Sequence, residues 1–230
     1  MIKIYDDFLD DDLYDRLGKT GMTFSQVQWI GRYAKPENAF HEFVKKLFFH
    51  AYPNVWRQDE IMGATAWWNI RPSNPKPHND RISYCTVDGV DYTPKDIPKQ
   101  TFIYYLRAPD KGGRLDIYTQ PPITDVKIGK EQFFSWAEHQ TDSVAPINNR
   151  LISFPFDVIH QIQPYEGNRV SIGTIFWSKL PSNYGETDPM VNTSYDRPWE
   201  VKSNKAGTRK LTEQSILKDA GWISHPGGGS

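Results

Sequence analysis

The hydrophobic positions near the start of the chain recur at helical spacing. Leu9, Leu13 and Leu17 lie four residues apart within residues 6–21, and acidic residues gather early, where a helix dipole favours them. Residues 38–51 carry a clearer apolar stripe, made of Phe40, Phe43, Val44, Leu47 and Phe48. A proline follows at position 53 and ends the second pattern. Two amphipathic helices are therefore predicted before residue 53.

The pattern changes to short alternating stretches from residue 61 onward. Residues 168–177 alternate most clearly, with Val170 and Ile172 on one face and Arg169 and Ser171 on the other. Four further stretches have the composition of strands, at residues 61–71, 101–107, 113–119 and 150–160. Gly, Pro, Asn and Asp residues separate them. Short strands divided by such residues predict an antiparallel barrel or sandwich.

Three regions interrupt this pattern. Residues 88–99 are polar and contain two prolines, which predicts a loop. Residues 121–149 predict a long loop with a short helix over residues 130–139, and long loops in compact domains are often functional. The chain is polar after residue 180 and ends in three glycines and a serine. We therefore expect one domain over residues 1–180, followed by a partly flexible extension over residues 181–230.

Composition and charge narrow the function classes. The 27 Lys and Arg residues balance 28 Asp and Glu residues, so no overall basic field exists to hold a nucleic acid, and none is expected as a partner. A single cysteine excludes an internal disulfide framework and a cysteine-cluster metal site. The chain has no apolar run of the length that a membrane helix needs, and its first residues lack the apolar core of a signal peptide. A cytoplasmic protein without a membrane partner is expected.

One histidine among six is followed at the second position by a carboxylate, in the sequence His78-Asn79-Asp80. On an extended segment, residues i and i+2 point to the same side, so both side chains can reach one metal ion. Alone, such a pair is more often two surface residues than a metal site. A second histidine would complete a facial triad of the kind that suits Fe(II) and leaves three positions open. His160, which follows an apolar run, is the candidate.

Arg169 begins the alternating stretch nine residues after His160, and Ser171 lies on the same face. An arginine that faces the interior of a barrel needs an anion, because burying an unpaired guanidinium is costly. A dicarboxylate could supply it through bidentate hydrogen bonds. A structural ion pair with a local acid such as Glu166 is the alternative.

Taken together, these segments resemble the 2-oxoglutarate/Fe(II)-dependent dioxygenases, specifically the prolyl 4-hydroxylase type. The matching segments occur in the family's order over about 110 residues. They are His78-x-Asp80, Ile103-Tyr104-Tyr105-Leu106, Gly112-Gly113-Arg114-Leu115-Asp116-Ile117, Asn149-Arg150-Leu151-Ile152-Ser153-Phe154, His160 and Arg169-x-Ser171. The resemblance implies a mainly β (α+β) fold: a double-stranded β-helix, or jelly-roll and cupin-like barrel, with N-terminal helices packed on the larger sheet.

The resemblance also implies roles for individual residues. Those for the metal are the three iron ligands His78, Asp80 and His160. Arg169, Ser171 and Tyr105 would bind the distal carboxylate of 2-oxoglutarate. Arg169 is counted as a catalytic residue together with the three iron ligands. Tyr104 would exchange places with Tyr105 if the strand register differed by one residue. Trp68 lies ten residues before His78, where relatives often have a tyrosine near the co-substrate.

The implied activity is hydroxylation of a C–H bond, with a prolyl residue of a peptide or protein as the leading substrate. The reaction would consume O2 and 2-oxoglutarate and release succinate and CO2, and ascorbate is a candidate cofactor. One alternative is a hydroxylase of a free amino acid or another small metabolite. Others are a non-catalytic cupin-like binding module and a zinc hydrolase, which would leave Arg169 and Ser171 unexplained. The sequence leaves the oligomeric state open.

Overall fold

The computed structural model describes residues 2–20, 27–31, 35–53, 61–70, 77–80, 86–87, 90–91, 100–120, 124–128, 131–135 and 141–178. Within these residues the protein consists mainly of antiparallel β-strands, with two helices near the start of the chain. The extension predicted over residues 181–230 lies outside the described residues. In the described part of the chain, neither helix combines the length and the apolar character that a membrane crossing requires.

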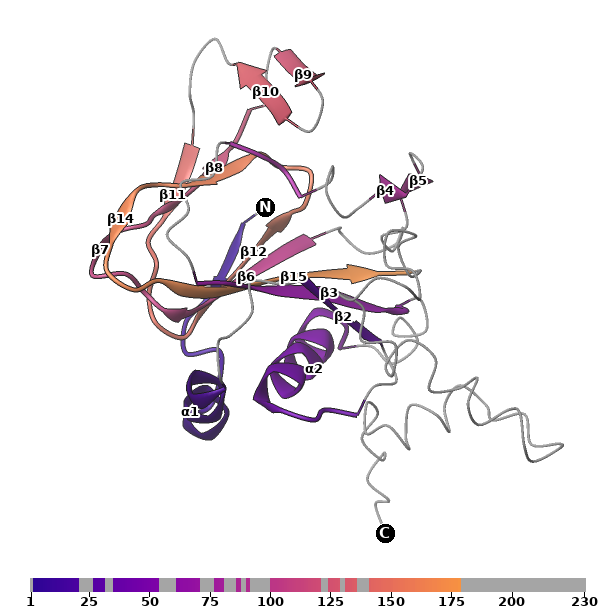
Figure 1. Ribbon diagram of the computed structural model, residues 1–230, viewed down its shortest axis with the longest axis vertical. Coiled ribbons are helices and arrows are strands. Elements are labelled where there is room, and N and C mark those ends of the chain that lie inside the picture. The colour runs from indigo at the N-terminus through magenta and orange to yellow at the C-terminus, as the bar shows by residue number, and fades with distance from the viewer. Residues whose placement is uncertain are drawn as a thin grey trace, which may run out of the picture.

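The largest element is a six-stranded antiparallel sheet (Figure 1). Its strands, in spatial order, are β1 (Lys3–Tyr5), β12 (Arg150–Pro155), β6 (Gln100–Arg107), β15 (Val170–Trp177), β3 (Gly63–Asn69) and β2 (Val27–Gly31). Each strand pairs antiparallel with its neighbours. Four of the predicted strand stretches therefore lie in one sheet.

A three-stranded antiparallel sheet faces one side of the larger sheet (Figure 1). It consists of β11 (Thr141–Val144), β8 (Leu115–Tyr118) and β13 (His160–Ile162). Three two-stranded ribbons complete the β structure of the described residues: β14 (Tyr165–Glu166) with β7 (Lys111–Gly112), β10 (Glu131–Ser135) with β9 (Thr124–Ile128), and β4 (Thr86–Val87) with β5 (Val90–Asp91).

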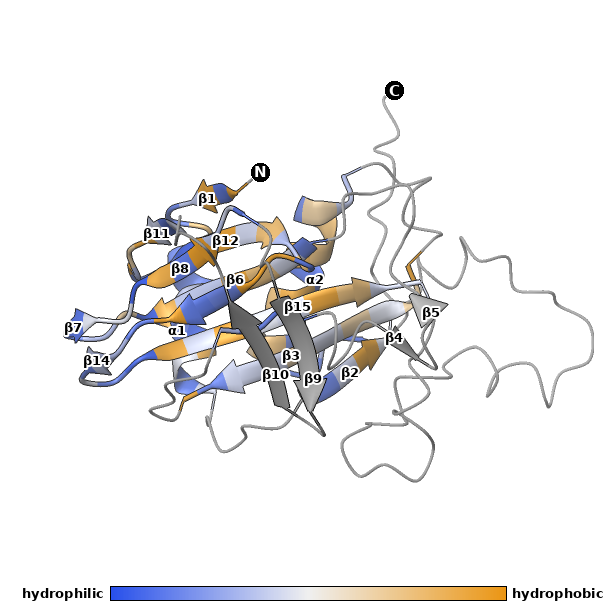
Figure 2. Cartoon of the chain, turned by 90° about the horizontal axis from the view of Figure 1, so that it is seen from above, coloured by the Kyte–Doolittle hydropathy of each residue, from blue (hydrophilic) through white to orange (hydrophobic). Residues whose placement is uncertain are grey.

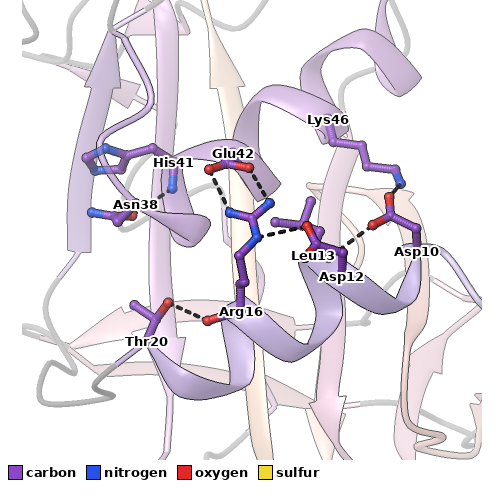
Figure 3. Close-up of polar contacts among 9 residues, drawn as sticks. All are labelled: Asp10, Asp12, Leu13, Arg16, Thr20, Asn38, His41, Glu42 and Lys46. Atoms are coloured by element: carbon purple, nitrogen blue, oxygen red, sulfur yellow. Dashed lines mark hydrogen bonds and ion pairs between the residues drawn. The ribbon is translucent and has the colours of Figure 1, made fainter.

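The two helices cover the opposite face of the six-stranded sheet (Figure 1). Helix α1 (Asp11–Lys19) begins after Asp10, whose side chain accepts a hydrogen bond from the backbone N–H of Leu13. Helix α2 (Ala39–Ala51) begins after Asn38, which caps His41 in the same way. Two surface ion pairs join the helices, Arg16 with Glu42 and Lys46 with Asp10, and Arg16 also pairs with Asp12 within α1 (Figure 3).

The six-stranded sheet divides the hydrophobic core in two, because side chains alternate between its faces. Its outer face packs against α1 and α2 through residues that include Phe102, Tyr104 and Ile172. Its inner face packs against the three-stranded sheet, and this second cluster is Ile103, Tyr105, Leu115, Ile117, Val144, Ile152, Phe154 and Ile162. Figure 2 shows the resulting bands of hydrophobic residues along the strands. Strands with both faces buried are expected to have few polar positions.

Most predicted elements are confirmed, but the long loop predicted over residues 121–149 contains three strands, β9, β10 and β11. The helix predicted over residues 130–139 is wrong, because residues 131–135 form strand β10 instead. Ile128 pairs with Glu131, so only Gly129 and Lys130 separate the two strands, which is the length of the tightest β-hairpin connection. The loop predicted over residues 88–99 lies mostly outside the described residues, apart from strand β5.

Candidate functional site

Two histidines from distant parts of the chain are paired through their backbones. His160 is the first residue of β13, and His78 lies opposite it in an isolated antiparallel bridge. Each residue's backbone N–H donates to the other's carbonyl, at 3.1 Å from His78 and 2.8 Å from His160. Residues directly opposite one another in an antiparallel pair project to the same face. Their imidazole rings accordingly lie with centroids 4.5 Å apart.

Asp80 joins this pair. It lies two residues after His78, and only 5% of its surface is exposed. Its Oδ2 atom is 3.9 Å from Nε2 of His160. One potential ligand atom from each of the three residues lies within 4.8 Å of the others. Two imidazoles and one carboxylate in this arrangement could hold a metal ion and leave coordination positions free.

The tautomer of His160 suits metal binding. Its Nδ1 atom lies 3.2 Å from the carbonyl oxygen of Val158. Because a carbonyl can only accept, Nδ1 carries the proton and the lone pair is on Nε2, the nitrogen that faces Asp80. Burial lowers the pKa of His160, although the Asp80 carboxylate partly offsets this effect. The ring is therefore neutral near pH 7, as a metal ligand must be.

A buried hydroxyl contacts the carboxylate. Thr101 of β6 is fully buried, and its Oγ1 donates a 2.7 Å hydrogen bond to Oδ2 of Asp80. Thr101 is not among the site residues that the sequence predicts. The available signal was a hydroxyl-bearing residue at the start of an otherwise apolar and aromatic strand, but nothing local indicates its partner 21 positions earlier.

A second polar group lies on the inner face of the same sheet. Arg169 is 2% exposed, and none of its three guanidinium nitrogens has a hydrogen-bond partner among the residues that the structure describes. Its Cζ atom lies 5.2 Å from the ring centroid of Tyr105 and 5.8 Å from that of Tyr165. The Tyr105 and Ser171 hydroxyls are also buried without a hydrogen-bond partner in the described part of the chain. Three unsatisfied polar side chains in one place indicate a binding site for a polar ligand.

Burial raises the pKa of Tyr105, and the nearby Arg169 guanidinium offsets this only in part. The Tyr105 hydroxyl therefore stays protonated at neutral pH and can act as a hydrogen-bond donor. Tyr104 lies on the outer face, where its hydroxyl donates to Oδ1 of Asn149 at 2.9 Å and its ring packs against Phe43. The structure thus brings Tyr105, and not Tyr104, next to Arg169.

Trp68 is the predicted site residue that the structure does not bring to this place. Its ring stacks on Phe40 of α2, with centroids 5.1 Å apart, and it belongs to the outer-face cluster. Alternation along β3 puts its neighbour Trp67 on the inner face, where Trp67 is paired with Gly173. The expected placement of Trp68 is therefore wrong. Of the two tryptophans, Trp67 shares a face with Tyr105 and Ser171.

Strand β6 links the two polar groups. Tyr105, beside Arg169, and Thr101, beside Asp80, lie four residues apart on its inner face, a separation of about 13 Å along the strand. Asp80 of the histidine–aspartate cluster and the Arg169 guanidinium therefore both lie beside the inner face of β6.

No protein-family model matches the sequence, and a search of curated proteins finds no match. Among solved structures, the protein is similar to a prolyl 4-hydroxylase from Pseudomonas putida, with 16% identity, a TM-score of 0.47, and coverage of 78% of this chain and 88% of that one. It is also similar to a viral collagen prolyl hydroxylase from Paramecium Bursaria Chlorella virus-1, in complex with 2OG, with 16% identity and a TM-score of 0.47. That match covers 78% of this chain and 96% of the viral one. A third similar structure is a Trichoplax adhaerens prolyl hydroxylase in complex with a hypoxia-inducible-factor peptide, with 16% identity and a TM-score of 0.44. That match covers 77% of this chain and 83% of the other. These similarities are too weak to assign a function, which depends on the residues of the site.

Proposed function

We propose that the protein is an Fe(II)- and 2-oxoglutarate-dependent dioxygenase that hydroxylates a C–H bond. One observation supports this proposal above the others. The cluster of His78, Asp80 and His160 contacts the inner face of β6 through the hydrogen bond from Thr101 to Asp80. Arg169, a buried guanidinium without a hydrogen-bond partner in the described residues, lies beside Tyr105 on the same face of that strand. A metal site alone would fit many activities. A metal site together with an unsatisfied buried cation fits a co-substrate that has both a chelating end and an anionic end.

The donor set fits Fe(II). Two imidazoles and one carboxylate are the donor set of the facial triad that is typical of non-haem Fe(II) oxygenases, and such a triad would leave coordination positions for a chelating ligand and O2. Bound iron would supply the oxidative chemistry, in which 2-oxoglutarate is converted to succinate and CO2 as the substrate gains a hydroxyl group. His78, Asp80 and His160 would hold the metal.

The anion-binding end fits the distal carboxylate of 2-oxoglutarate. The Arg169 guanidinium can donate two parallel hydrogen bonds to a carboxylate, and the protonated Tyr105 hydroxyl and the Ser171 hydroxyl can donate further ones. Such a ligand would satisfy all three buried groups at once. Leaving a buried guanidinium without a partner would be costly, which supports an anion rather than a neutral molecule at this end.

The protein's own residues mainly orient the reactants. Arg169 and Tyr105 would fix one end of the co-substrate, so that its keto acid end reaches the metal in a single orientation. The buried inner face excludes bulk water from the reacting groups. His160 stays a neutral ligand because burial lowers its pKa.

We further propose that the two facing sheets form a double-stranded β-helix that is carried by residues 1–180. The proposed substrate is a prolyl residue in a peptide or protein, with ascorbate as a supporting cofactor. A free amino acid or another small metabolite is the substrate to test against it. Incubation with proline-containing peptides and with free amino acids, followed by mass spectrometry for the gain of one oxygen atom, separates the two.

Anaerobic titration with Fe(II) and then 2-oxoglutarate tests the central proposal. The visible metal-to-ligand charge-transfer band of the chelated keto acid should appear. Arg169→Ala and Tyr105→Phe should raise the 2-oxoglutarate concentration that is needed for this band. The matched control is Tyr104→Phe, because Tyr104 is equally buried on the same strand but faces the helices.

Each result of this titration has a defined meaning. A protein that binds Fe(II) but forms no band would contradict the 2-oxoglutarate assignment. A protein that binds neither would contradict the enzyme assignment and favour a binding module. Equal effects of Tyr104→Phe and Tyr105→Phe would show that the tyrosine acts through folding and not through the co-substrate.

A further inference from the structure

Thr101 occupies a position where an apolar side chain would be expected. Its cross-strand neighbours on the inner face are Phe154 of β12 and Ile175 of β15. All three residues are almost completely buried. A hydroxyl buried in such surroundings costs free energy unless it has a hydrogen-bond partner. Valine has the same shape as threonine, a similar preference for strands and no such cost. The hydroxyl therefore needs an explanation beyond packing.

The hydrogen bond from Thr101 to Asp80 provides that explanation. The donor and acceptor atoms are 2.7 Å apart, and both side chains are buried, so the bond is a short, charge-assisted one shielded from water. Asp80 lies in a turn after the bridge at His78, outside the regular strands. The hydrogen-bond ladder of the sheet therefore does not fix the rotation of its carboxylate, whereas β6, in the middle of the large sheet, gives Thr101 a rigid place.

We propose that Thr101 is a positioning residue that sets the orientation of the Asp80 carboxylate for metal binding. This inference rests on the metal site of the proposed function. The hydrogen bond to Oδ2 fixes the carboxylate relative to the two imidazoles before an ion arrives, so the ion does not have to order it. Partners that orient metal ligands in this way typically contribute a factor of about 10 to 100 to metal affinity.

The test compares Thr101→Val, which removes only the hydroxyl, with Thr101→Ser, which keeps it. The Fe(II) dissociation constant is measured without oxygen, and the absorption spectrum of bound Co(II) reports the coordination geometry. Thr101→Val should weaken Fe(II) binding by about 10- to 100-fold and change the Co(II) spectrum. Thr101→Ser should stay close to the wild-type protein in both measurements.

Thr174 provides a matched control within the same sheet. It is also a fully buried threonine, it pairs with Phe102 next to Thr101, and its side chain lies on the outer face. Its hydroxyl has no hydrogen-bond partner among the described residues. Thr174→Val should therefore leave Fe(II) affinity and the Co(II) spectrum unchanged. Urea unfolding of each metal-free variant separates an effect on the site from an effect on folding, and Thr101→Ala replaces Thr101→Val if the valine variant is misfolded.

Failure of this inference can be distinguished from failure of the proposed function. Wild-type protein that binds no Fe(II) would contradict the proposed function itself. Wild-type protein that binds Fe(II), together with a folded Thr101→Val variant of equal affinity, would contradict only the role of Thr101. In the Asp80→Ala background, Thr101→Val should cause no further loss of metal affinity, because the group that it positions is gone. An additional loss there would also overturn the inference.

Discussion

The indole of Trp67 covers Gly173 on the inner face of the six-stranded sheet. The two residues pair across β3 and β15. A Cβ atom added to Gly173 would lie 2.8 Å from the indole nitrogen and still closer to two indole carbons. Real Cβ atoms do not approach other atoms so closely, so the ring or the strand would have to move. The glycine at this position therefore makes room for a neighbouring side chain.

Gly173→Ala should lower the free energy of unfolding by about 1–3 kcal/mol, the usual cost of overpacking a buried site. Urea unfolding measures this loss. Gly18→Ala is the control, because a Cβ at this helical position meets nothing within 4 Å, and it should raise stability by up to about 1 kcal/mol. Replacing Trp67 by leucine in the Gly173→Ala background should recover part of the loss. Equal stability of Gly173→Ala and the wild type would contradict the packing argument.

Sequence patterns identified which residues could carry chemistry better than they identified the sheet face on which each side chain lies. The tyrosines at 104 and 105 are both buried, so no contrast between polar and apolar neighbours shows which one faces Arg169. The same ambiguity affects Trp67 and Trp68. Asn149 bonds the backbone of Leu9, which is 140 positions away, and no local pattern predicts such a partner. Residue type was therefore enough to name candidate ligands. The sheet face on which a side chain lies, and the residue that it contacts, could be found only from the fold.

The start of helix α1 is stabilised by a carboxylate. Asp10 accepts a hydrogen bond from the backbone N–H of Leu13 and forms an ion pair with Lys46 of α2 (Figure 3). The Leu13 hydrogen bond, and then Lys46, lower the pKa of Asp10 from 3.8 to about 2. A carboxyl whose pKa is lower in the folded state stabilises that state only while it is ionised. This single residue thus joins a helix cap to the packing of two helices.

The stabilising effect of Asp10 should disappear as the pH falls from about 4 to about 2, between its unfolded and folded pKa values. Asp10→Asn keeps a capping side chain but cannot ionise. The urea midpoint of the wild-type protein should exceed that of Asp10→Asn above pH 4, and the difference should shrink towards pH 2. Asp142→Asn, which alters an exposed carboxylate on β11, should show a smaller difference at pH 5. A difference for Asp10→Asn that does not change over this range would contradict the argument.

Elements with a strong period were predictable, and elements that depend on pairing were not. The apolar stripe of α2 and the alternation of β15 each carry enough positions to identify the element. β10 lies where a short helix was predicted over residues 130–139, and β9 lies in the part of residues 121–149 that was predicted as a loop. Strands of two or three residues, such as β1, β7 and β14, are too short to show a period. Their existence depends on a partner strand that the local sequence does not indicate.

The candidate site combines residues from several layers of the molecule. Thr101, Tyr105 and Ser171 belong to the six-stranded sheet, whereas His160 belongs to the three-stranded sheet. His78 reaches the site through its backbone bridge to His160. Spacing in the sequence could suggest the histidine–aspartate pair, but only the packing of one sheet on the other brings Asp80 to Thr101. A ligand bound here would therefore connect elements that are separate in the chain.

This arrangement predicts that metal binding stabilises the whole fold. At a free Mn(II) concentration of 100 times its dissociation constant, the free energy of unfolding should rise by about 2.7 kcal/mol, because the unfolded chain has no assembled site. Urea unfolding with and without Mn(II) measures this increment. Asp80→Ala should abolish most of it. His50→Ala is the control, because His50 packs against Tyr5 and Phe8 away from the site. That variant should lose some stability in both conditions but keep the increment. An equal increment in Asp80→Ala would mean that the ion stabilises the protein from another place.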